Sequence, residues 1–161
     1  MDKRDHSQRV AQAEQIVIAG LARGEDLDEL AEALRAIALR GDIVVGESLI
    51  RLAADALRLG GFSAAEPLEY DGLREKYLPE IEFRGRVSHR NSQYVLYAAA
   101  ALRGGVLPDV YADAGWWQAE LWQSALYAVV AYARAAAERR GESTADVARA
   151  LAAARGESVT A

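Results

Sequence analysis

The sequence predicts an all-α protein, a single-domain bundle of about six or seven helices with a long irregular connection near residues 60–90. Three observations lead to this class. Arg-Gly dipeptides recur behind apolar stretches, and the apolar residues between these dipeptides recur at helical spacing. The alternation of β-branched residues that a strand requires is confined to one short candidate, EIEFRGRV at 80–87. A length of 161 residues with 52% hydrophobic residues fits one globular domain over 1–161.

The Arg-Gly dipeptides predict where helices end. A glycine just past a helix closes the last turn by adopting the left-handed conformation. The positive charge of an arginine in that turn interacts favourably with the negative end of the helix dipole. An acidic or hydroxyl residue that starts the next helix follows most of them, as in Asp42 and Ser143. The dipeptides are Arg23-Gly24, Arg40-Gly41, Arg103-Gly104, Arg140-Gly141 and Arg155-Gly156, with Leu59-Gly60 as a variant.

The N-terminal part, about 7–59, is predicted to contain helices near 7–23, 26–40 and 42–59. Each carries apolar residues three, four and seven positions apart, so each has one face for a core. These residues are Val10, Val17 and Leu21 in the first helix, Leu27, Leu30, Leu34 and Ile37 in the second, and Val45, Leu49, Leu52, Ala56 and Leu59 in the third. The loops between them are short, which makes the helices antiparallel neighbours.

A long connection at 60–90 separates this part from the C-terminal helices. It contains Pro67, Pro79 and several glycines, and LREKYLPEI within it predicts a short additional helix. The C-terminal helices, about 91–155, are predicted near 91–103, 112–140 and 143–155.

Two of these C-terminal helices are unusually apolar. The helix near 91–103 has no polar face, which is typical of a helix at the centre of a domain or in an oligomer interface. The helix near 112–140 is apolar over more than half of its circumference, so it needs partners on two sides. Together they predict more apolar surface than one small domain covers, and therefore a homo-oligomer, a two-fold dimer.

The first candidate site is the basic segment EFRGRVSHRNSQY at 82–94. It places Arg84, Arg86, His89 and Arg90 ahead of a helix N-terminus. Guanidinium groups, free backbone N–H groups and the helix dipole together favour an anion such as phosphate or carboxylate. The alternative is an ordinary capped helix start with solvated or ion-paired arginines, because the glycine-rich spacing of a phosphate loop is missing.

The second candidate site is a stripe on the helix near 112–140. The stripe is the only part of the helix that is not apolar, and it consists of Trp116, Glu120, Gln123, Tyr127, Arg134 and Glu138; the first four of these are the candidate site residues. As a pocket wall it would combine large apolar surfaces with a few polar groups, and a buried Glu120 would serve as a general acid or base. The alternative is a solvent face whose aromatic rings have a polar edge.

Composition argues against several other functions. A formal net charge of -5 opposes binding to nucleic acid and to anionic membranes. The chain has no cysteine, and its two histidines, His6 and His89, lack metal-ligand spacing, so we predict no metal site and no cofactor. The N-terminal stretch is polar and the apolar IVIAGLA is too short to span a membrane, which predicts a cytoplasmic protein.

The sequence therefore favours a non-catalytic helical module that binds a partner or has a structural role. The alternative is a protein that binds an anionic small molecule, or an enzyme acting on one, with its site at the 84–90 loop and the Trp116–Tyr127 stripe.

Overall fold

The computed structural model describes residues 3–39, 42–63, 65–66, 68, 70–79 and 121–155. All secondary structure in these residues is helical, which confirms the all-α class. The helices are α1 (Lys3–Arg23), α2 (Leu27–Arg35), α3 (Ile43–Leu59), α4 (Tyr70–Tyr77), α7 (Leu121–Arg140) and α8 (Thr144–Ala154). None of these described helices has both the length and the hydrophobicity needed to cross a membrane. The predicted helix at 91–103, the start of the one at 112–140 and the strand candidate at 80–87 lie outside the described residues.

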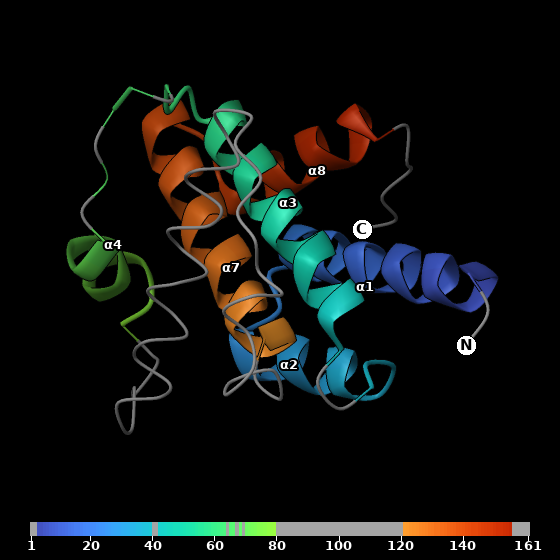
Figure 1. The fold of residues 1–161 in the computed structure, drawn as a ribbon. Coiled ribbons are helices and arrows are strands. Elements are labelled where there is room, and N and C mark those ends of the chain that lie inside the picture. Colours follow the sequence, from blue (N-terminus) through green and yellow to red (C-terminus); the bar gives the residue numbers. More distant parts are fainter. Residues whose placement is uncertain are drawn as a thin grey trace.

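The helices form a bundle around α3 and α7, which pack along each other over most of their lengths (Figure 1). α1 and α8 pack against each other, and both also contact α3. α2 lies at one end of the bundle, where it contacts α1 and α7, and α4 packs on the outer side of α7 (Figure 1). Among the described helices, α7 thus packs against α2, α3, α4 and α8, as expected for a central helix.

The side chains of α7 account for this central position. Between Trp122 and Ala137, only Gln123, Tyr127 and Arg134 are partly exposed, and all other residues are buried. Tyr132 is fully buried. The partly exposed residues belong to the narrow stripe that the sequence separates from the apolar arc, so the described part of this helix packs as predicted.

Most helix boundaries follow the predicted capping residues. Asp26, Asp42 and Ser143 are N-caps whose side chains accept hydrogen bonds from the first turns of α2, α3 and α8. Gly24 follows α1 with a φ of 75°, and Gly141 follows α7 with a φ of 66°. These left-handed glycines confirm two of the Arg-Gly helix ends.

α2 is shorter than predicted: it ends at Arg35, whereas the sequence pattern predicted an end near residue 40. The backbone N–H groups of Ile37 and Ala38 both donate to the carbonyl oxygen of Leu34, at 3.0 and 2.8 Å. This tight turn ends the helix before the Arg-Gly dipeptide is reached. Apolar periodicity continues through Ile37, so the sequence pattern gives no sign of the earlier end.

The end of α3 also differs from the prediction in one detail. The left-handed glycine is Gly61, with a φ of 76°, while Gly60 keeps a helical conformation. Gly60 is required for a different reason: a Cβ atom at this position would lie 2.9 Å from both Cα and Cβ of Ala136. Glycine therefore lets the end of α3 approach the backbone of α7. Arg140 of α7 completes this contact by donating from Nη1 to the carbonyl oxygen of Leu59 at 3.0 Å.

Polar contacts attach α4 to α7. Glu138 accepts from Lys76 Nζ at 2.7 Å and from the Tyr77 hydroxyl at 3.1 Å. Arg134 Nη1 donates to the carbonyl oxygen of Tyr77 at 2.6 Å, at the end of α4. Arg134 and Glu138 both lie on the predicted polar stripe of α7. This half of the stripe is therefore the surface on which α4 packs.

The buried carboxylate of Asp42 joins α1 to the start of α3. Its side chain is 2% exposed. Arg9 of α1 donates to it from Nε at 3.0 Å and from Nη2 at 3.3 Å, which is a bidentate contact. The backbone N–H groups of Leu39 and Val45 donate to its two oxygens at 3.1 and 3.2 Å. Both carboxylate oxygens are thus satisfied at the same time by the cap and by a neighbouring helix.

These contacts set the pKa of Asp42. Burial disfavours the charged form and raises the pKa, but the hydrogen bonds from Arg9 and from two backbone N–H groups, with the positive charge of Arg9, outweigh it. The pKa of the Asp42 carboxyl group therefore lies below its ordinary value of 3.8. A lowered pKa means that the carboxylate stabilises the folded state above pH 3.8, and that this contribution is lost as the pH falls through the folded-state pKa.

We predict that Asp42→Asn lowers the free energy of unfolding at pH 7 by about 2–3 kcal/mol, because Arg9 loses its charged partner and an amide N–H meets other donors. The difference from wild type should shrink as the pH falls below 3.8. Urea unfolding followed by circular dichroism across this pH range measures it. Asp26→Asn is the control, because Asp26 is an exposed N-cap and asparagine caps as well as aspartate. An equal loss in both variants, or a difference that does not depend on pH, would contradict the prediction.

Candidate functional site

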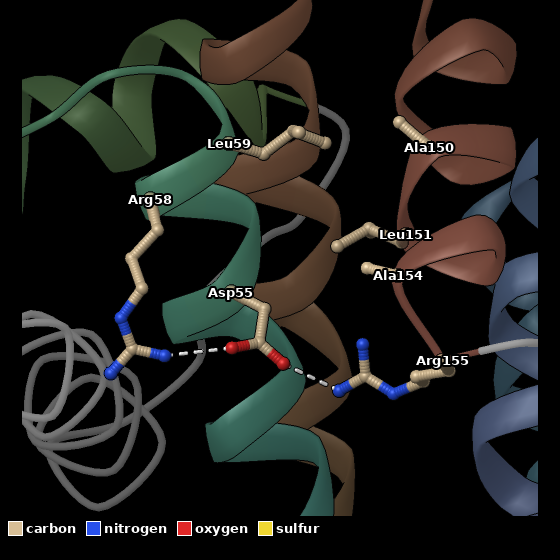
Figure 2. A pocket seen from close by; sticks show the side chains of 7 residues that line it. All are labelled: Asp55, Arg58, Leu59, Ala150, Leu151, Ala154 and Arg155. Carbon is tan, nitrogen blue, oxygen red and sulfur yellow. Dashed lines mark hydrogen bonds and ion pairs between the residues drawn. The ribbon is translucent and has the colours of Figure 1, made fainter.

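A groove between α3 and α8 is the candidate site among the described residues (Figure 2). Its volume is ≈ 570 Å³. Apolar side chains form its floor, and charged side chains stand at its rim. The lining residues are Asp55, Arg58, Leu59, Ala150, Leu151, Ala154 and Arg155.

Helical spacing places these residues on facing surfaces. Asp55, Arg58 and Leu59 are three and four positions apart on α3, so they lie on one face of it. Ala150 and Ala154 are one turn apart on α8. Their methyl groups leave the space that larger side chains would fill, and this is why a groove exists between two helices that otherwise contact each other.

Arg155 closes one end of the groove. It directly follows α8 as the C-cap, and its side chain is 18% exposed. Nε donates to Glu14 Oε2 of α1 at 3.3 Å, and Nη2 donates to Asp55 Oδ2 of α3 at 2.6 Å. One guanidinium group thus links the end of α8 to α1 and to α3. Glu14 is in turn held by Ser48 of α3, whose hydroxyl donates to Oε1 at 2.7 Å.

Asp55 lies between two guanidinium groups. Arg58 Nη1 donates to its Oδ1 at 2.7 Å, from one turn further along α3, and Arg155 donates to Oδ2 (Figure 2). With Glu14 included, the cluster contains two guanidinium groups and two carboxylates, and its formal charges cancel. Both oxygens of Asp55 are occupied by charged donors, and a guanidinium group does not lose its proton in a protein. The cluster is therefore suited to holding hydrogen-bonding groups in place, and poorly suited to proton transfer.

Only two of the residues that the sequence predicts for a site are among the described residues. Gln123 and Tyr127 lie one turn apart on α7, both partly buried, and Gln123 Nε2 donates to the Tyr127 hydroxyl oxygen at 2.6 Å. The remaining candidates, Arg84, Arg86, His89, Arg90, Trp116 and Glu120, lie outside the described residues. An anion site at the 84–90 loop stays a prediction.

The groove itself is not apparent in the sequence. Arg155 belongs to the repeated Arg-Gly dipeptides, and the sequence pattern identifies it only as the end of a helix. Its partners Glu14 and Asp55 are 141 and 100 positions away along the chain. Neither contact follows from local spacing. The only available signal is the pair of alanines one turn apart on the last helix, and alanine is frequent throughout this chain.

In the part of the chain that the structure describes, no group of three or more His, Cys, Asp or Glu residues is arranged to hold a metal ion.

The chain matches no known protein family model, no curated protein and no solved structure. Its function is therefore inferred from the groove and from the chemistry of the groups that line it.

We predict that Arg155→Met lowers the free energy of unfolding by about 1–3 kcal/mol, because it leaves the partly buried Glu14 and Asp55 without a shared cation. Hydrogen exchange in α8 should become faster, since the arginine fixes the end of this helix. The control is Arg149→Met on the same helix, whose arginine pairs with Asp146 at the surface, each side chain about half exposed. Its unfolding midpoint should stay at the wild-type value. Equal effects of both changes would show that the Arg155 contacts contribute no more than a surface ion pair.

Proposed function

We propose that the protein is a non-catalytic helical binding module, and that the groove between α3 and α8 is where a partner binds. The observation that carries this proposal is the combination of an apolar floor, made by Leu59, Leu151 and the two alanines, with a guanidinium group fixed at one end. Binding sites typically pair apolar surface with a small number of oriented polar groups. The groove volume lies within the usual range for such sites, roughly 300–1,000 Å³.

The rigidity of the groove supports binding. Its walls stand on helices that are anchored in the core: Leu57 of α3 and Val147 and Ala148 of α8 are fully buried. The orientation of Arg155 is fixed from two sides by carboxylates on other helices. A site on such elements loses little conformational freedom when a partner binds, and so keeps more of its interaction free energy.

The chemistry of the rim favours binding over catalysis. Asp55 is engaged by two guanidinium groups, so it is a poor general base, and neither arginine can act as a general acid. The groups that line the groove can accept or donate hydrogen bonds and can cover apolar surface. They offer neither a nucleophile nor a proton donor.

We predict that tert-butanol, used as a probe of apolar binding surfaces, shifts the methyl and amide NMR signals of Leu59, Ala150 and Ala154 in wild type. Ala154→Met should abolish these shifts, because Ala154 is exposed at the groove and a longer side chain fills it. Ala153→Met is the matched control, because Ala153 is also exposed on α8 but does not line the groove. Probe shifts that are equally large elsewhere on the described surface, or that survive in Ala154→Met, would argue against the groove as the binding surface.

Self-association is a second part of the proposal, and it rests on the sequence at 91–103, which has no polar face. The described part of α7 gives it no additional support, because helices of the same chain already cover its apolar surface. We therefore place the contact between copies on the apolar 91–103 segment.

We predict that sedimentation equilibrium at high micromolar concentration gives the mass of a dimer. The dimer should persist in Ala154→Met, since the groove and the dimer contact are separate surfaces in this proposal. A monomeric mass for wild type would contradict the proposed self-association. If wild type is a dimer and Ala154→Met is a monomer, the contact between the two copies involves the groove.

A further inference from the structure

One nitrogen of Arg155 faces the groove and has no hydrogen-bond partner among the described residues. Nε and Nη2 donate to Glu14 and Asp55, and Nη1 has no hydrogen bond to any residue that the structure describes. Figure 2 shows the guanidinium nitrogen that no dashed line meets directed toward Ala154 and Leu151, over the apolar floor. Nη1, which carries two N–H groups, thus faces the apolar part of the groove, while the carboxylates of Glu14 and Asp55 occupy the other two nitrogens. An occupant that fits must supply an acceptor at this end and apolar surface beyond it.

The charges around this nitrogen select the kind of acceptor. Arg155 already contacts two carboxylates, and with Arg58 the four formal charges sum to zero. A further anion on Nη1 would be the third negative group around one guanidinium, and it would be repelled by Asp55 and Glu14 at short range. An uncharged acceptor, such as a carbonyl oxygen, takes the same hydrogen bond without this repulsion. The balance of charge therefore favours a neutral carbonyl over a carboxylate or phosphate.

Other arginines of this protein make the same contact within the fold. Arg134 Nη1 donates to the carbonyl oxygen of Tyr77 at the end of α4, and Arg140 Nη1 donates to that of Leu59 at the end of α3. Carbonyl groups in the last turn of a helix have no partner within the helix, so they are natural acceptors for such a donor. In both cases the arginine attaches a helix end to a neighbouring helix.

We infer that the groove between α3 and α8 binds a peptide segment of a partner protein, which offers an uncharged backbone carbonyl to Arg155 Nη1 and an aliphatic side chain to the floor formed by Leu59, Leu151 and the alanines. This inference rests on the proposed function, because it names the partner of the same groove. The acceptor belongs to the end of a helix or to a loop of the partner, where backbone carbonyls are free.

Three leucine derivatives of different charge test the inference by NMR titration of the full chain. N-acetyl-leucine methylamide is neutral and has two carbonyls, N-acetyl-leucine carries a carboxylate, and leucine methylamide carries an ammonium group. All three share the same aliphatic side chain. We expect the neutral methylamide to bind most tightly, with shifts at Ala150, Ala154, Leu59 and the Arg155 Nε–H. Its shifts should be lost in Ala154→Met and retained in Ala153→Met.

The possible results separate this inference from the proposed function. Equal or tighter binding of N-acetyl-leucine, or of leucine methylamide, would overturn the neutral acceptor while leaving the groove as a binding surface. Shifts from tert-butanol with none from the methylamide would have the same meaning. If neither tert-butanol nor any leucine derivative shifts the groove signals, both the inference and the proposed function fail. Groove signals that shift with protein concentration alone would replace the partner peptide with a second copy of this chain.

Discussion

The close packing of α3 on α7 is the contact on which the rest of the fold depends. It is possible because both helices present small side chains where they meet: alanines recur along each helix, and glycine stands where the end of α3 meets Ala136. Backbones that approach closely bury the larger side chains around the contact on all sides, including Leu52 and Val129. Every other described helix then contacts one or both of these two. Small side chains also account for the groove. The alanines of α8 let this helix pack against its neighbours, and they leave space beside Arg155.

Arginines attach the peripheral elements to this central pair. Arg9 connects α1 to the start of α3, Arg134 and Arg140 reach the ends of α4 and α3, and Arg155 connects α8 to α1 and α3. A planar guanidinium group with five N–H donors can satisfy several acceptors from different helices at once, which an ammonium group cannot do with the same geometry. This explains how a chain so rich in alanine, whose side chains specify little by shape, still fixes the relative positions of its helices.

Local signals made the helices predictable. Asp42 and Ser143 are helix starts because their side chains accept from N–H groups only three residues away, and Gly141 is a helix end because glycine adopts the left-handed conformation without strain. These interactions are complete within one turn of chain, so the sequence displays them. The early end of α2 was missed because the turn after Arg35 depends on backbone hydrogen bonds and not on a particular side chain.

The groove was not predictable for the opposite reason. Glu14, Asp55 and Arg155 are brought together only by the packing of α1, α3 and α8, and each has an ordinary local interpretation as a charged residue on a helix surface. The candidates that the sequence did offer were chosen by local clustering of arginines and by position on one helix face. Of these, Gln123 and Tyr127 are described, and their hydrogen bond is again a contact within one turn.

In the proposed binding mode, the position of Arg155 couples binding to the fold. The same guanidinium group that holds the end of α8 against α1 and α3 also faces the groove, so an occupant on Nη1 bonds to a side chain whose other donors are structural. A ligand that binds only the arranged cluster stabilises that arrangement in proportion to its concentration over its dissociation constant. Loosening of α8 would conversely weaken binding, because Nη1 is directed into the groove only while Glu14 and Asp55 hold the other two nitrogens. In the proposed binding mode, occupancy of the groove and attachment of the last helix are therefore one linked equilibrium.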